Sequence, residues 1–172
     1  MEPLKQIRTG RCRHVAWGTS VESGQVVGRA HDLARIPAHR RFISAEPLLG
    51  DPEFSRIFRA HHPDTFHLVI SGGESGVKSR PMHPAWVESI ERDCQEHQIP
   101  HHAKQWGTWV PAELHALVGP ADNPGNKTAV TYAGCYPENP DQAHAVMHRA
   151  PSKDAVPLLI DGKVQQPRLL FA

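Results

Sequence analysis

The chain has 172 residues, of which 39% are hydrophobic and 22% are charged, as expected for one ordinary soluble domain. Its formal net charge is +1, from 19 Lys and Arg residues against 18 Asp and Glu residues, so its overall charge predicts no attraction to nucleic acid or membranes. No apolar stretch approaches the roughly 20 residues that a membrane-spanning helix needs. The charged N-terminus, MEPLKQIRTGRCRH, lacks the apolar segment of a signal peptide, so we expect a cytoplasmic protein.

The first two predicted units each consist of a strand followed by a helix. Residues 13–22, RHVAWGTSVE, are an apolar, β-prone run, and residues 23–37 favour a helix that ends at a proline. Residues 40–47, RRFISAEP, form the second predicted strand. Residues 51–61 then place three apolar side chains at helical spacing, which predicts the second helix.

The third unit shows the clearest pattern. Residues 66–74, FHLVISGGE, predict a strand, and the helix that follows begins at Pro84. A fourth strand is predicted over residues 99–107, IPHHAKQWG. The helix from Pro84 places Trp86, Val87, Ile90 and Cys94 on an apolar face and Glu88, Glu91, Arg92 and Glu96 on a face toward water.

Repeated strand–helix units predict a parallel sheet. The residues that close the four strands follow one another by 24 to 30 residues, a spacing that suits right-handed parallel crossovers. We therefore predict an α/β fold of parallel βα repeats. In such folds the carboxyl ends of the strands meet at one edge, where ligands bind, so Glu22, Glu46, Glu74 and Lys104 should converge. The glycines Gly72 and Gly73 allow a tight turn and a close approach of backbone to ligand.

Each of these side chains also has a purely structural interpretation. Glu46 precedes Pro47 and could simply end a strand, while Glu22 could cap the segment that follows it. Lys104 could be an ordinary ion-pair partner of one of the acids. Glycine-rich turns such as GGESG close many strands without binding any ligand, and Trp106 and Trp109 are better explained by packing than by stacking on a ligand.

We place a domain boundary near residue 110. Residues 1–110 are predicted to form the βα part, and residues 111–172 an irregular C-terminal extension that packs on the same domain. Residues 110–142 are dense in Pro, Gly and Asn and show no sustained period. An Asp161-Gly162 turn between short apolar runs predicts a hairpin-like element near the end of the chain.

Cysteines and histidines do not form a recognisable metal motif. Cys12, Cys94 and Cys135 lie far apart, which favours reduced, structural thiols. The thirteen histidines show no HExxH or HxH spacing, and the His-His pairs at 61–62 and 101–102 are more typical of surface or strand-edge positions than of ligands. We therefore expect no metal site. A candidate basic patch lacks the interleaved aromatic residues of a strand-binding surface; it consists of Arg8, Arg11, Arg13, Arg40 and Arg41.

Several segments, in order, resemble a known family. These are VAWGTSVE, RFISAEPLLG, the long stretch from LVISGGESG through RPMHP to HAKQWGTW, and the terminal LLIDGK. They are similar to the motif series of a phage-associated family of unknown function whose full-length members carry a three-cysteine motif and look like radical-SAM enzymes. The resemblance covers about residues 14–110, and 145–165 more weakly. It implies a radical-SAM-like (βα) TIM-type barrel, of which this chain corresponds to the C-terminal half.

The resemblance assigns roles to the strand-end residues. Glu46, Glu74 and Lys104 become the catalytic candidates, with both glutamates accepting hydrogen bonds from ribose or amine groups. Lys104 and Gln105 would orient an anionic substrate. The residues implied in cofactor binding are Gly72, Gly73, Ser75, Glu22 and Gln105.

The sequence departs from the family at the cysteine motif. A [4Fe–4S] cluster that binds S-adenosylmethionine needs three thiolates from one loop, and no tight cysteine cluster precedes HVAWGTSVE. We therefore expect no cofactor in this chain alone; S-adenosylmethionine and the cluster are implied only for full-length members.

Three functional hypotheses remain open at this point. In the first, the chain is half of an enzyme that is not catalytic by itself and requires a missing N-terminal half. In the second, it is a non-catalytic binding module of phage or mobile-element origin that acts on a protein partner. Both predict self-association or a partner that covers an exposed sheet edge. In the third, the carboxylates bind Mg²⁺ or Mn²⁺ for phosphoester hydrolysis, since hard cations prefer oxygen ligands.

Overall fold

The computed structural model describes the backbone of residues 13–111, 129–133, 144–149, 159–160 and 163–164, and the side chains of residues 13–111. Four strands of the first segment form a parallel sheet in the order β1-β2-β3-β4. The predicted parallel α/β arrangement is therefore confirmed, and the four strands do not close into a barrel. The bounds are β1 Ala16–Ser20, β2 Arg40–Ala45, β3 Leu68–Gly72 and β4 His101–Gln105.

Each crossover between neighbouring strands contains a helix, as predicted. The third helix begins at Pro84, whose missing N–H costs nothing in the first turn, and the side chain of His83 accepts a hydrogen bond from the Ala85 N–H. The second begins two residues after Pro52, at Phe54. The helices are η3 Gly24–Val26, α1 Gly28–Ala34, α2 Phe54–Arg59, η4 Pro63–Thr65 and α3 Pro84–Glu96.

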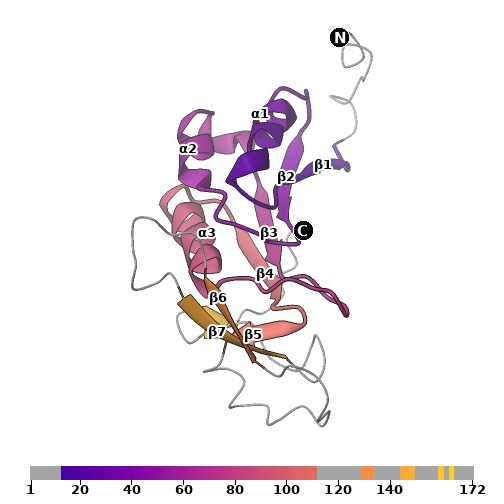
Figure 1. Cartoon of the computed structure of the whole chain (residues 1–172). Coiled ribbons are helices and arrows are strands. Elements are labelled where there is room, and N and C mark those ends of the chain that lie inside the picture. Colours follow the sequence, from indigo (N-terminus) through magenta and orange to yellow (C-terminus); the bar gives the residue numbers. More distant parts are fainter. Residues whose placement is uncertain (1–12, 112–128, 134–143, 150–158, 161–162, 165–172) are drawn as a thin grey trace.

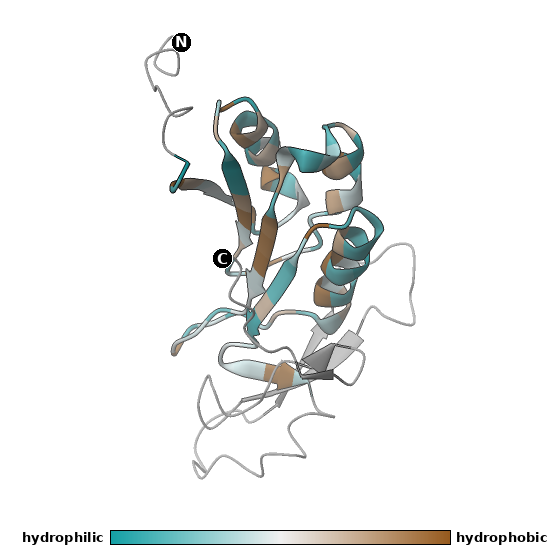
Figure 2. Ribbon diagram, turned by 180° about the vertical axis from the view of Figure 1, so that it is seen from behind, coloured by the Kyte–Doolittle hydropathy of each residue, from teal (hydrophilic) through white to brown (hydrophobic). Residues whose placement is uncertain are grey.

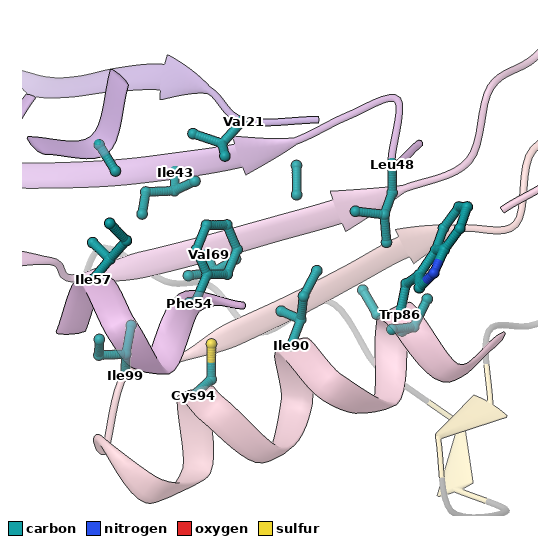
Figure 3. Close-up of a cluster of buried hydrophobic side chains, with 14 of the residues drawn as sticks. Val21, Ile43, Leu48, Phe54, Ile57, Val69, Trp86, Ile90, Cys94 and Ile99 are labelled. Carbon is teal, nitrogen blue, oxygen red and sulfur yellow. The ribbon is translucent and has the colours of Figure 1, made fainter. Parts of the chain in front are cut away.

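The hydrophobic core lies between the sheet and its helices (Figure 3). Alternate residues of a strand point to the same face, and Ile43 and Val69 pair in register and are both fully buried in this core. Phe54 of α2 and Ile90 of α3 pack against them from the helix side. The predicted apolar face of α3 is confirmed, because Trp86, Val87, Ile90 and Cys94 are all buried.

The helices α1, α2 and α3 all cover the same face of the sheet (Figures 1 and 2). The other face, which we call the helix-free face, carries the alternate strand residues, and none of the described helices lies on it. These residues are less uniformly apolar than those of the core. Register and alternation assign to the helix-free face Gly18, Phe42, Ser44, Leu68, Ile70, Gly72 and His102.

The C-terminal region contains regular strands, which the sequence did not predict. Strand β5, Trp109–Pro111, pairs antiparallel with β7, His144–Arg149, and β7 pairs antiparallel with β6, Ala129–Ala133. The expectation of an irregular extension is therefore wrong for these strands, whose pairing is non-local and gives little sequence signal. The hairpin around Asp161-Gly162 is supported, because β8 Leu159–Ile160 and β9 Lys163–Val164 pair antiparallel.

Within the described residues, no helix is long and apolar enough to cross a membrane. Cys94 is a free, buried thiol, in agreement with the structural role predicted for it. Cys12 and Cys135 lie outside the described residues, as do Arg8 and Arg11 of the candidate basic patch.

Candidate functional site

The carboxyl ends of β2 and β4 bring an acid and a base together. Glu46 follows β2 directly, and its Oε1 lies 3.3 Å from the Nζ of Lys104 on β4. The Ser44 hydroxyl donates to the other carboxylate oxygen of Glu46 over 3.4 Å. The Glu46 side chain is 22% exposed and that of Lys104 is 54% exposed, so both charged groups are accessible to a ligand. The sequence predicted this convergence from strand ends alone.

Two glycines at the end of β3 make room for other parts of the protein. A Cβ on Gly72 would lie 2.5 Å from the Glu46 Oε1, so the carboxylate of Glu46 lies directly over this glycine. A Cβ on Gly73 would lie 1.8 Å from the backbone oxygen of Trp106. Both glycines therefore lie against the protein's own atoms, which fill the space next to both α-carbons. Ligand approach to this turn stays a prediction.

Glu74, which follows the glycines, binds an arginine in its own loop. Its carboxylate accepts hydrogen bonds from the Arg80 backbone N–H, Nε and Nη2 over 2.8 to 2.9 Å. These hydrogen bonds lower the pKa of Glu74 to about 2 from its usual 4.5. The loop is held further by the Trp109 indole N–H, which donates to the Ser79 carbonyl over 2.8 Å. Glu74 therefore shapes the loop beside the site and is ionised at neutral pH.

Glu22 also has a local cation. Its Oε2 lies 2.9 Å from Nη1 of Arg29, and the same nitrogen donates to the Ser20 carbonyl over 3.2 Å. The four predicted residues thus form three separate ion pairs, and only Glu46 and Lys104 pair with each other. Sequence analysis missed Arg29 and Arg80 because both lie in connecting segments seven and six residues from their acids, where no strand pattern marks them.

Gln105 and Ser75 extend the edge toward β4. The Gln105 side-chain amide lies 3.5 Å from the Ser75 hydroxyl, at the limit of a hydrogen bond. The backbone joins the same segments more firmly, because the Gly73 N–H donates to the Gln105 carbonyl over 2.9 Å. Both cofactor-binding candidates therefore lie at the carboxyl edge, beside the glycine turn. Trp106 is 3% exposed and belongs to the core, which confirms a packing role.

A buried polar network lies on the opposite, helix-covered face. His101 is hydrogen-bonded to Ser71 through Nε2 at 2.8 Å and to Glu91 of α3 through Nδ1 at 2.5 Å. The hydrogen bond from His101 lowers the pKa of Glu91. One expectation is corrected here, since Glu91 is not a water-facing residue. His101, only 2% exposed in its side chain, lies on the edge strand β4, one of the two kinds of position predicted for the His-His pairs. Because Ser71 is fully buried, this network fixes α3 against β3 and β4 and is closed to substrate.

The strand-end carboxylates are not arranged to bind a metal ion. Within the part of the chain whose side chains are described, no group of three or more His, Cys, Asp and Glu residues is arranged to hold a metal ion. Each strand-end carboxylate instead has a cationic side chain within 3.3 Å. The oxygen ligands that Mg²⁺ would need are therefore already neutralised by protein cations.

The fold and its edge define a mixed α/β protein with a polar candidate site at the carboxyl ends of a parallel sheet. The chain belongs to the family described as "Protein of unknown function (DUF5131)", which matches residues 2–166. No curated protein and no solved structure matches the chain.

Proposed function

We propose that this chain is the ligand-positioning half of a TIM-type barrel in a phage-associated, radical-SAM-like protein, and that it performs no radical chemistry by itself. The observation that carries the proposal is the Glu46–Lys104 pair, which lies at the carboxyl edge of four sequential parallel strands. In TIM-type barrels this edge carries the active site and the helix-free face is the interior. A second polypeptide whose strands continue the sheet at its two edges, β1 and β4, would complete such a barrel.

The pair is suited to a ligand that carries both an amine and a carboxylate. Glu46 offers an acceptor to an ammonium group, and Lys104 offers a donor to an anion. Without ligand, Glu46 and Lys104 neutralise each other. A zwitterionic ligand would replace this ion pair with two, one to each side chain, so that no charge is left unpaired. S-adenosylmethionine carries these groups in its amino-acid portion, and its ribose adds hydroxyl groups that Gln105 and Ser75 could bind.

The cysteine within the described side chains does not fit an iron–sulfur cluster. Cys94 is 1% exposed on the core side of α3, and burial raises its pKa well above the usual value for a thiol. A cluster ligand must be a thiolate at an accessible loop. We therefore propose that a loop with three cysteines, from a separate N-terminal half, supplies the reducing centre in the assembled protein. Held by those cysteines, such a centre would supply the reducing electron that radical-SAM chemistry requires.

Isothermal titration of S-adenosylmethionine into the purified chain tests the ligand-binding part. We expect saturable binding that Glu46→Gln and Lys104→Met each weaken at least tenfold. Glu96→Gln is the matched control, because Glu96 is also paired with a cationic side chain, that of Arg59 at 2.7 Å, but on the helices. Equal binding by the Glu46→Gln and Glu96→Gln variants would contradict the proposal.

The cofactor part is tested by anaerobic reconstitution with iron and sulfide. We expect the chain alone to acquire no [4Fe–4S] absorbance and a mixture with a three-cysteine N-terminal half to acquire it. Cluster formation by the chain alone that Cys94→Ser abolishes would contradict the assignment of Cys94 to the core.

A non-catalytic binding module is the second candidate, favoured by the apolar side chains of Phe42 and Ile70 on the helix-free face. It predicts tight association with a protein partner that Glu46→Gln leaves unchanged. Divalent-metal phosphoester chemistry is less well supported, because each candidate carboxylate is ion-paired. It predicts thermal stabilisation by Mg²⁺ that Glu46→Gln and Glu74→Gln each abolish.

A further inference from the structure

Strand β1 forms one edge of the parallel sheet, and no described strand pairs with its outer side (Figure 1). Its pairing with β2 is regular from Ala16 through Ser20, and its sequence, AWGTS, contains no charge and no proline. Uncharged, regular edges are templates for pairing with another strand, and proteins usually blunt them with charged residues, prolines or bulges. Strand β1 carries none of these within its five residues.

The opposite edge differs in each of these features. Strand β4, HHAKQ, carries Lys104, and its pairing with β3 is interrupted by a register shift between Ser71 and Gly72. Both features blunt an edge against further pairing. Of the two edges of the sheet, β1 is therefore better suited than β4 to pair with a further strand.

The backbone groups available on β1 follow from its pairing. The Val21 N–H donates to the Ser44 carbonyl, so the odd-numbered residues of β1 direct their backbone groups to β2. The even-numbered residues Ala16, Gly18 and Ser20 direct theirs outward. Arg29 already donates to the outward Ser20 carbonyl over 3.2 Å, as the N–H of a neighbouring strand would.

The sequence around β1 is self-complementary about Gly18. In an antiparallel pair of two copies centred on this glycine, Val15 lies opposite Val21 and Trp17 lies opposite Thr19 of the second copy. Aromatic and β-branched residues are favourable cross-strand neighbours.

We propose that β1 pairs antiparallel with β1 of a second copy of this chain, with a two-fold axis at Gly18. A two-fold contact uses the same surface on both copies, which the symmetric segment provides. On the helix-free face, the Phe42 ring lies over Gly18, since a Cβ there would be 2.2 Å from the ring. The two Phe42 rings therefore extend the contact beside the axis. This pairing concerns the chain in the absence of a barrel-completing partner, which would replace the second copy at β1; it involves neither Glu46 nor Lys104, so it can fail without affecting the ligand chemistry proposed above.

Size-exclusion chromatography with light scattering tests the pairing. We expect a dimer that dissociates on dilution. Ala16→Pro removes an outward N–H but no hydrogen bond to β2, so this variant should be monomeric with an unchanged melting temperature. Ala16→Gly, which keeps the N–H, should remain dimeric. A monomeric wild type at all concentrations, or a dimeric and folded Ala16→Pro variant, would overturn the proposal.

Two further measurements keep the test decisive if Ala16→Pro fails to fold. Hydrogen exchange of the Gly18 amide in the wild-type chain should slow as protein concentration rises, and exchange that is independent of concentration would refute the pairing. Arg29→Ala frees the outward Ser20 carbonyl for a hydrogen bond from the second copy, so it should lower the dimer dissociation constant severalfold. A higher dissociation constant in this variant would show that the edge is not the contact.

Discussion

The two faces of the parallel sheet differ in chemistry, although they are built from alternate residues of the same strands. The helix-covered face contributes Ile43, Ala45 and Val69 to a core in which each is fully buried. The helix-free face carries Ser44, Gly72 and the Glu46–Lys104 pair instead. Figure 2 shows the same strands from behind, with polar and apolar residues interspersed. The difference teaches that one face forms the hydrophobic core, whereas the other carries the polar groups that we propose bind a ligand.

The largest expected loss of stability comes from truncating an aromatic side chain to alanine, and it should differ between the two faces. Phe54→Ala removes a fully buried ring that stacks against Phe58 at 5.5 Å, and should lower the free energy of unfolding by about 3–5 kcal/mol. Phe42→Ala, on the helix-free face, removes a half-buried ring and should cost much less. Urea denaturation measures both. Equal losses would show that the helix-free face is part of the core.

A smaller effect is expected at the glycine turn. A Cβ on Gly73 would overlap the Trp106 backbone oxygen, which cannot rotate away, so Gly73→Ala should cost about 1–3 kcal/mol or more. Gly28→Ala is the control, since a Cβ there meets nothing within 4 Å at the start of α1. That substitution should be neutral or stabilise by up to about 1 kcal/mol. Thermal melting of both variants tests whether the turn is as tightly packed as the distances indicate.

The Glu74–Arg80 pair predicts a pH dependence. The folded-state pKa of Glu74, about 2, lies below its ordinary value of 4.5, so its contribution is full above about pH 5 and is lost as pH falls toward about 2. At neutral pH, Glu74→Gln should cost about 1 kcal/mol, because the Arg80 side chain is 58% exposed and solvent weakens the pair. Stability curves of the two proteins should converge at low pH. A constant difference down to about pH 2 would contradict the assigned pKa.

The smallest stability effect is expected at the candidate site itself. Lys104→Met removes one partner of a pair in which the Lys104 side chain is 54% exposed, and should change the free energy of unfolding by about 0–1 kcal/mol. Ligand binding should nevertheless be weakened strongly in the same variant. A double-mutant cycle with Glu46→Gln separates the two effects. A large loss of stability would identify the pair as structural.

The parallel sheet and its helices were predictable because each strand is bounded by glycine, proline or a charged residue and each helix has a clear apolar face. The convergence of Glu46 with Lys104 follows from strand order and was also predicted. The arginines bound to Glu22 and Glu74 were not, since Arg29 lies on α1 and Arg80 in a loop, and the strand pattern that placed the acids marks neither position. The antiparallel strands β5, β6 and β7 escaped prediction because the sequence of residues 110–142 is dense in Pro, Gly and Asn and shows no sustained period. The burial of His101 was missed because His-His pairs resemble surface sequence.

We propose above all that the carboxyl edge of the helix-free face binds S-adenosylmethionine. The most direct test is a two-dimensional ¹⁵N NMR titration of the whole chain with S-adenosylmethionine. The account predicts saturable shifts at the backbone amides of Gly72, Gly73 and Gln105, which disappear in Glu46→Gln. Shifts confined to α1, α2 and α3, or no shifts at any concentration, would contradict it.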